Sequence, residues 1–190
     1  RSQLNPHFIF NALNSIKALV DEEPLLAKRS ITQMSHILRS SLASGKKKFV
    51  SLGEELKVVN DYLELEKIRY EERLSYDVIV GQEFYNCTIP PLLIQTLVEN
   101  AIKHGIAHLP EGGRIVVQSK FESDSFMKIS VTTSGQLKSS HNTDSTSGIG
   151  LENSRRRLNL LYGDKASLTI FNDGNQVVCD VIIPYEKSRN

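Results

Sequence analysis

The chain has 190 residues, 39% of them hydrophobic and 24% charged, which are ordinary values for a globular protein of one large or two small domains. The formal net charge of +1 argues against bulk electrostatic binding to nucleic acid or to an anionic membrane surface. Cys87 and Cys179 lie far apart and give neither a disulfide framework nor a metal-binding signature, so a reducing compartment is the natural interpretation.

The N-terminal part of the chain, residues 1–50, predicts a helical hairpin. Residues 1–20 are typical of an amphipathic helix, which Asp21-Glu22-Glu23-Pro24 ends, because the residue before a proline avoids helical torsion angles. A second helix is predicted over about 25–42, with a bundle-like seam at Ile31, Met34, Leu38 and Leu42. Two such helices bury little apolar surface alone, so we expect a second copy of the chain to complete a four-helix bundle. Residues 40–50 are polar and lysine-rich and are expected to form a hinge or linker.

Residues 51–190 predict an α/β sandwich. Ser51-Leu52-Gly53-Glu54 has the pattern of a capping box that opens a third helix, and alternating apolar residues from Leu74 predict a strand. The remaining predicted elements are a helix over about 90–104 opened by Pro90 and Pro91, strands over 114–121 and 126–132, a helix from Gly148 to Gly163, and strands over 167–171 and 177–183. The fold class is therefore α+β, with helices on one face of a mixed, mostly antiparallel sheet.

The predicted helix over 90–104 carries polar residues on one side. Asn100, Lys103 and His104 are neighbours on the helix surface, because residues three and four apart lie one turn from each other. An amide oxygen suits Mg²⁺ and an ammonium suits phosphate, so the pattern indicates a polyphosphate with a bound cation. Glu99, on the adjacent side, could polarise a water or a nucleophile. For this segment alone, an amphipathic helix with a solvated polar face is the more conservative interpretation.

Two further segments could take part in nucleotide chemistry. Gly148-Ile149-Gly150-Leu151 follows a Ser/Thr-rich loop and opens a helix, where backbone N–H groups attract phosphate. It is neither a Walker loop nor a dinucleotide-binding fingerprint, and glycine pairs at helix starts are common. His7, in the first turn of the first helix, is either exposed and structural or a nucleophile that becomes phosphohistidine.

Two long motifs and a third, shorter one resemble those of LytS/YehU-type sensor histidine kinases. The motif Gln3-Leu4-Asn5-Pro6-His7-Phe8-Ile9-Phe10-Asn11-Ala12-Leu13-Asn14 is similar to the phosphoacceptor segment of that family. The stretch from Pro90 to Gly105, with Val98-Glu99-Asn100-Ala101-Ile102-Lys103-His104 at its end, resembles the N box. The segment that begins Gly148-Ile149-Gly150-Leu151-Glu152-Asn153 is similar to the second glycine box.

This resemblance implies a Bergerat-type ATP-binding domain at 51–190 behind a dimerisation and phosphotransfer segment at 1–50. It implies that His7 accepts a phosphoryl group from ATP, that Asn100 coordinates Mg²⁺, and that Lys103 and His104 approach the phosphates. By the same resemblance, Glu99 orients or deprotonates the attacking group, and Gly148, Gly150 and Leu151 close on the triphosphate. The implied partners are a second copy of the chain and a response regulator, for which the LytTR type is one option, whose aspartate receives the phosphoryl group. The implied location is the cytoplasmic side of a membrane, behind an upstream sensor region.

The sequence departs from the family pattern at the adenine end of the expected pocket. Thr133, in Val131-Thr132-Thr133-Ser134-Gly135, stands where the family usually has an acidic residue or an asparagine that binds the adenine amino group. A lost charged hydrogen bond is worth roughly 1.5–3 kcal/mol, so adenine recognition is expected to be weakened or altered. Two hypotheses follow: an ATP-dependent histidine kinase, and a degenerate, non-catalytic dimerisation module with weak nucleotide binding.

Overall fold

The computed structural model describes residues 6–45, 47–137 and 149–185 of the chain. Within these ranges it contains five α-helices: α1 (Pro6–Glu22), α2 (Pro24–Ser44), α3 (Leu52–Tyr70), α4 (Leu93–His104) and α5 (Ile149–Tyr162). The same ranges contain seven strands: β1 (Val50–Ser51), β2 (Leu74–Ile79), β3 (Thr88–Ile89), β4 (Gly113–Ser123), β5 (Phe126–Ser134), β6 (Ser167–Asp173) and β7 (Gln176–Pro184). Among the described residues, no helix is long and apolar enough to cross a membrane.

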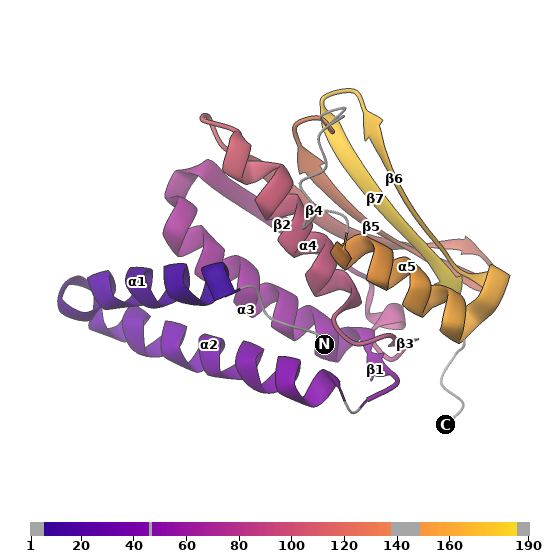
Figure 1. Cartoon of the computed structure of the whole chain (residues 1–190), viewed down its shortest axis with the longest axis horizontal. Helices are drawn as coiled ribbons and strands as arrows, with labels where there is room; N and C mark the ends of the chain where they lie inside the picture. Colours follow the sequence, from indigo (N-terminus) through magenta and orange to yellow (C-terminus); the bar gives the residue numbers. More distant parts are fainter. Residues whose placement is uncertain (1–5, 46, 138–148, 186–190) are drawn as a thin grey trace.

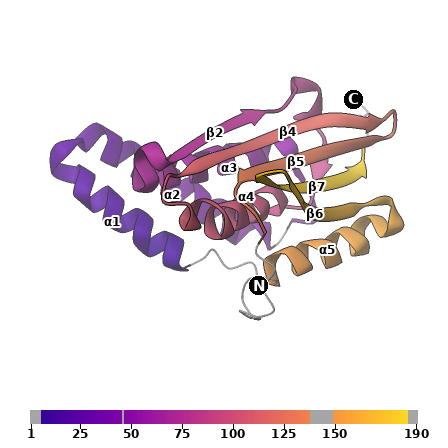
Figure 2. The ribbon, with the colours of Figure 1, turned by 90° about the horizontal axis from the view of Figure 1, so that it is seen from above.

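The strands form one large sheet and one small ribbon. The large sheet has the order β2-β4-β5-β7-β6, in which β2 and β4 are parallel and the other neighbours are antiparallel. Helices α3, α4 and α5 cover one face of this sheet (Figures 1 and 2). The α+β class and the mixed, mostly antiparallel sheet predicted from the sequence are therefore confirmed. The ribbon of β1 and β3 was not predicted, because two-residue strands leave no periodic pattern.

Helices α1 and α2 form a hairpin that packs on α3, on the side away from α5 (Figure 1). Phe8, Ala12 and Ile16 of α1 and Ala27, Met34 and Ile37 of α2 belong to the same buried apolar cluster as the sandwich. The hairpin is tied to α3 by polar contacts as well: Arg29 Nη2 donates to Glu64 Oε2 at 2.9 Å, and His36 Nδ1 pairs with Asp61 Oδ2. The division of the chain at residue 50 stays a prediction, since α3 is shared by both parts of this core.

Several helix boundaries depart from those predicted. The capping box is confirmed, with Glu54 N donating to Ser51 Oγ at 3.1 Å and Ser51 N donating to Glu54 Oε2 at 3.0 Å. Helix α2 continues to Ser44, so residues 40–44 of the predicted hinge are helical and are not a linker. Here Ser44 Oγ donates to the carbonyl oxygen of Ser41 at 2.6 Å, which satisfies a polar group in the last turn.

The prediction that Pro90 and Pro91 open the central helix was wrong. Helix α4 begins at Leu93, after Leu92, which adopts the left-handed conformation with φ of 60°. The residue before a proline is restricted to extended backbone, so Ile89 and Pro90 continue from β3 and the helix starts later. A positive φ is costly for leucine, and the surroundings must hold it in place.

Candidate functional site

The polar half of α4 lies at its C-terminal end. The opposite face of the helix is apolar and packs against α3 and β5. Its buried residues are Leu93, Ile94, Leu97, Val98, Ala101 and Ile102. Lys103 and His104 are exposed, and Glu99 and Asn100 are half-buried. The structure therefore presents these four predicted residues along one side of α4. Burial, together with the charges of Lys103 and His108, lowers the pKa of His104, which favours the neutral imidazole.

Asn100 has an orientation suited to a hard cation. Its Nδ2 donates to the carbonyl oxygen of Thr96 at 2.7 Å, one turn earlier on α4. The amide nitrogen is thereby engaged, and the amide oxygen is the atom that would ligate Mg²⁺. Among the described residues there is no cluster of three or more His, Cys, Asp or Glu side chains that could hold a metal by itself. A cation here would take its other ligands from phosphate oxygens and water.

Glu99 is a carboxyl group that titrates near neutrality. Burial raises its pKa to about 7, and the negative charge of Glu66 acts in the same direction. Gln95 Nε2, one turn earlier, donates to Glu99 Oε1 at 2.8 Å and opposes the shift by stabilising the carboxylate. A base with a pKa close to the working pH is effective in general acid–base catalysis.

The start of α5 lies directly against the polar side of α4. A Cβ added to Gly150 would lie 3.3 Å from Thr96 Cγ2 and 3.6 Å from Asn100 Nδ2. Glycine therefore lets the first turn of α5 approach α4 closely beside Asn100, which brings the backbone N–H groups of a helix N-terminus near this amide. Leu151 follows in the first turn of α5 and is half-buried, and Gly148 lies outside the described residues.

Thr133 sits at the far end of α4 from this glycine. It is on β5 with 5% of its surface exposed, and a Cβ added to Gly105 would lie 2.8 Å from its Oγ1. Gly135 follows with φ of 111°, a conformation that favours glycine, and its N–H donates to the carbonyl oxygen of Asn175 at 2.9 Å. The structure thus brings Thr133 to the C-terminus of α4.

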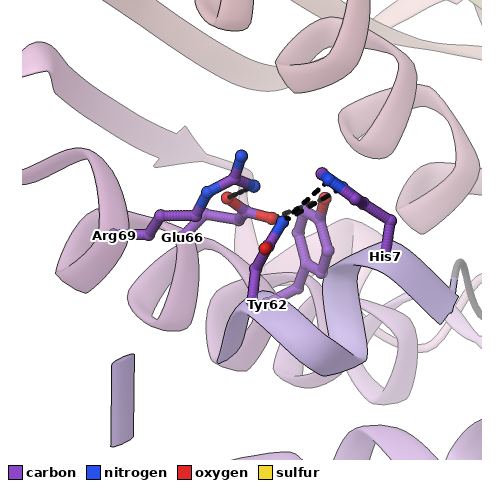
Figure 3. Close-up of polar contacts among 5 residues, drawn as sticks. His7, Tyr62, Glu66 and Arg69 are labelled. Atoms are coloured by element: carbon purple, nitrogen blue, oxygen red, sulfur yellow. Dashed lines mark hydrogen bonds and ion pairs between the residues drawn. The ribbon is translucent and has the colours of Figure 1, made fainter. Parts of the chain in front are cut away.

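His7 occupies the first turn of α1 and faces α3. The ring of Phe8 packs on the ring of Tyr62, with centroids 4.6 Å apart, and the amide nitrogen of Asn11 lies 3.0 Å from His7 Nδ1. Figure 3 shows the His7 ring pointing toward Tyr62, which lies beside Glu66 and Arg69. Burial raises the pKa of Tyr62, and the charges of Glu66 and Glu99 act in the same direction. The Tyr62 hydroxyl donates to Glu66 Oε1 at 3.3 Å.

The sequence-based prediction did not include the residues of α3 that face His7 and α4 among the candidate site residues. Tyr62, Glu66 and Arg69 follow one another at helical spacing, and this was the available signal, although surface helices carry many such patterns. It also missed Glu55, which accepts N–H groups from Leu92 at 2.8 Å and from Gln95 at 3.1 Å. These pairs lie far apart in the sequence, so their contacts depend on how α3 and α4 pack.

The fold is that of histidine kinase catalytic domains. The catalytic domain of the histidine kinase ThkA covers 72% of this chain and 94% of its own length, at 22% identity and a TM-score of 0.53. The histidine kinase domain of the Erythrobacter litoralis EL346 blue-light activated kinase covers 95% of this chain and 96% of its own length, at 12% identity and a TM-score of 0.55. ThkA in complex with the response regulator protein TrrA covers 97% of this chain and 61% of its own length, at 20% identity and a TM-score of 0.53.

Comparison of amino-acid sequences shows which histidine kinases this chain is similar to. A family model described as histidine kinase matches residues 1–74. Sensor protein LytS of Staphylococcus saprophyticus is 37% identical over 97% of this chain, and sensor histidine kinase/phosphatase LytS of Staphylococcus aureus is 34% identical over 98%. Over nearly its whole length the chain is therefore homologous to LytS-type sensor histidine kinases. It spans about a third of the length of these relatives, 33% and 34% respectively.

Proposed function

We propose that the chain is the catalytic core of an ATP-dependent protein-histidine kinase, which phosphorylates His7 and passes the phosphoryl group to a response regulator aspartate. The observation that carries this proposal is the packing of Gly150 against Asn100, with Lys103 and His104 exposed beside them. A glycine-bordered helix N-terminus, an amide oxygen and cationic or neutral nitrogen donors together suit a magnesium–triphosphate.

The residues of the pocket have distinct proposed roles. Asn100 ligates Mg²⁺, which when bound neutralises charge on the transferring phosphoryl group. Lys103 and His104 contact the phosphates, and Gly148, Gly150 and Leu151 contribute backbone N–H groups at the opposite wall. Glu99 orients the attacking group or receives its proton. Thr133 and Gly135 border the adenine, with the Thr133 hydroxyl as the polar contact.

The exposed apolar surface of the helical hairpin supports a second copy of the chain as a partner. Large apolar side chains face solvent on α1 and α2, among them Phe10, with 68% of its surface exposed, and Leu42, with 81%. Such a stripe is costly on a monomer, so we propose that a second copy of the chain covers it and completes a four-helix bundle. The response regulator, of the LytTR type, docks on the same hairpin to reach His7. An upstream sensor region, supported by the greater length of the LytS relatives, would hold this cytoplasmic core at a membrane.

Incubation with radiolabelled ATP and Mg²⁺ tests the kinase proposal. The wild-type chain should acquire an acid-labile, base-stable label, and His7→Gln should acquire none. His36→Gln is the matched control, because His36 lies on the same hairpin but pairs with Asp61 on α3. Absence of label in the wild type, or equal label in His7→Gln, contradicts the proposal.

A non-catalytic dimerisation module is the second candidate, and the buried Thr133 favours it. A hydroxyl accepts a hydrogen bond from adenine but brings no charge, and its own hydrogen is directed to the carbonyl oxygen of Ser134 at 3.4 Å. Calorimetric titration with ATP and Mg²⁺ separates the two candidates. A dissociation constant in the micromolar range supports the kinase, whereas undetectable binding by a correctly folded dimer supports the module.

A further inference from the structure

The sequence gives His7 no acidic neighbour, since Phe8 follows it directly. An imidazole that attacks phosphorus gains positive charge, and a nearby anion or proton acceptor lowers the cost of that charge. In the structure Asn11 Nδ2 of α1 lies 3.0 Å from His7 Nδ1, and Tyr62 and Glu66 of α3 lie beside the ring (Figure 3). Tyr62 and Glu66 lie one helical turn apart on the side of α3 that meets α1.

Tyr62 and Glu66 form a buried pair. Tyr62 has 3% and Glu66 has 2% of its surface exposed, and the Tyr62 hydroxyl donates to Glu66 Oε1 at 3.3 Å. Arg69 Nη1 lies 3.4 Å from the other carboxylate oxygen of Glu66. A buried carboxylate is costly unless it is paired and hydrogen-bonded, so a fold keeps one at this depth only with such partners. Burial raises the pKa of Glu66, and the charge of Arg69 opposes that shift.

We propose that Tyr62 and Glu66 are positioning residues for His7, and that together they replace the acidic neighbour that the sequence lacks. This inference rests on the proposed function, in which His7 accepts the phosphoryl group. The Phe8–Tyr62 ring contact sets the first turn of α1 on α3, and the Tyr62 hydroxyl then faces the imidazole. Glu66 acts through Tyr62, by fixing the direction of its hydroxyl and by supplying negative charge.

The proposed step transfers the γ-phosphoryl group of ATP to one ring nitrogen of His7. The lone pair of one ring nitrogen of His7 forms a bond to the γ-phosphorus of ATP, and the bond from that phosphorus to the β–γ bridging oxygen breaks. The bond's electron pair leaves with ADP. The proton on the other ring nitrogen is shared with the Tyr62 oxygen, while the Tyr62 proton is shared with Glu66. The product is phosphohistidine with its ring charge balanced by the Glu66 carboxylate.

Helix α3 also takes part in a second tyrosine–glutamate pair, with a tyrosine from β2, and this pair serves as an internal control. Tyr76 on β2 donates its hydroxyl to Glu64 Oε1 at 2.8 Å, and Glu64 also accepts from Arg29. This pair connects α2 and β2 to α3. Removing its hydroxyl or its charge tests a loss of packing and hydrogen bonding without touching His7.

Single-turnover autophosphorylation of Tyr62→Phe, Glu66→Gln, Tyr76→Phe and Glu64→Gln tests the proposal. We expect the rate of phosphoryl transfer to fall about 10- to 100-fold in the first two variants, with the KM for ATP unchanged, and to stay within about twofold in the last two. Glu66→Asp should recover part of the rate, because it restores the charge. Equal rates in all four variants would overturn the proposal. If Glu66→Gln does not fold, Tyr62→Phe decides, since it removes a single oxygen atom.

A second measurement does not depend on activity. Long-range ¹H–¹⁵N spectra of the His7 ring report which nitrogen carries the proton. The signals should change in Tyr62→Phe and Glu66→Gln and stay as in the wild type in Tyr76→Phe and Glu64→Gln. If the wild type acquires no label from ATP, the proposed function fails, and these spectra still decide whether the pair positions the ring; unchanged spectra in all variants overturn it.

Discussion

The N-terminal and C-terminal ends of α4 differ in what surrounds them. The N-terminal end is buried and fixed: Glu55 accepts N–H groups from Leu92 and Gln95, and Arg157 Nη2 of α5 donates to the carbonyl oxygen of Pro91. The C-terminal end has few such ties, and its side chains Asn100, Lys103 and His104 face outward beside α5 and β5. One helix thus combines an anchored end, which holds three elements together, with an open end that presents reactive groups.

The difference shows why a polar residue on this helix cannot be assigned a role from its side-chain chemistry alone. Gln95 and Asn100 are both amides on α4. Gln95 has 2% of its surface exposed and connects Glu55 with Glu99, whereas Asn100 lies beside Gly150 at the open end. Changes at the anchored end should therefore alter the free energy of unfolding, and changes at the open end should alter catalysis.

The largest effect is expected for Asn100→Ala. Loss of the magnesium ligand should lower autophosphorylation at least about 100-fold, the scale of removing one preorganised group that stabilises a transition state. The free energy of unfolding should change by less than about 1 kcal/mol, because the side chain is only half-buried. Asn159→Ala, an exposed asparagine on α5, is the control and should keep wild-type activity. Activity within threefold of the wild type would remove Asn100 from the site.

Glu55→Ala should act on stability instead. It leaves two backbone N–H groups and Arg157 without their carboxylate, which should cost about 3 kcal/mol of unfolding free energy in urea denaturation. The specific activity of the folded fraction should be nearly unchanged. Glu72→Ala, at an exposed position beyond α3, is the matched control. If both variants unfold at the same urea concentration as the wild type, the anchored end is not what fixes α4.

The pH dependence of stability provides a third way to separate the two ends. Burial raises the pKa of Glu55 from 4.5 to about 7, so the folded state binds more protons than the unfolded state between these values. The contribution of the Glu55 carboxyl group to the free energy of unfolding is therefore fully present below pH 4.5 and is lost as the pH rises through 7. It amounts to roughly 3 kcal/mol for a shift of this size. Glu99, shifted in the same direction, adds to the slope.

In urea titrations from pH 5 to pH 8, Glu55→Gln should therefore lose about half of the pH dependence that the wild type shows, and Glu72→Gln should lose none. A slope as steep in Glu55→Gln as in the wild type would show that this carboxyl group does not titrate in the folded protein. The ordinary assumption for glutamate, a stability that grows with pH in this range, predicts the opposite sign.

Thr133→Asp tests the adenine end of the open site. A carboxylate in hydrogen-bonding reach of the adenine amino group should tighten ATP binding about tenfold, since the gain of a charged hydrogen bond is partly offset by burial of the charge. Thr132→Asp is the control, because neighbouring residues of a strand point to opposite faces of the sheet. Isothermal titration with ATP measures both. If ATP binds more tightly to Thr132→Asp, or no more tightly to Thr133→Asp than to the wild type, the adenine does not lie beside Thr133.

The smallest effect is expected for Gly150→Ala. The added Cβ would lie 3.3 Å from Thr96 Cγ2, so the Thr96 side chain or α5 must move by a few tenths of an ångström. The KM for ATP should rise about threefold, while thermal stability is maintained or rises, because alanine favours the helix by about 0.5–1 kcal/mol. Gly45→Ala, where an added Cβ meets nothing within 4 Å, should leave KM unchanged. An unaltered KM in Gly150→Ala would show that the α5 start does not approach the phosphates.

The sequence by itself determined the elements and the chemistry of the open end. Helical periodicity placed Asn100, Lys103 and His104 on one side, and the Ser51–Glu54 capping box fixed the start of α3, because these features depend on residues within a turn of each other. The position of α4's first residue was not predictable in this way. It depends on Glu55 of α3, whose carboxylate accepts hydrogen bonds from the backbone N–H groups of Leu92 and Gln95.

Only the tertiary structure decided which elements meet. The parallel pairing of β2 with β4, the approach of Gly150 to Asn100 and the position of Tyr62 and Glu66 beneath His7 all join segments distant in the sequence. Such contacts arise from the burial of one shared apolar core, and no local pattern records which faces are buried against each other. The sequence motifs predicted the reacting residues, and the packing of α3 against α1 and α4 determines which side chains surround them.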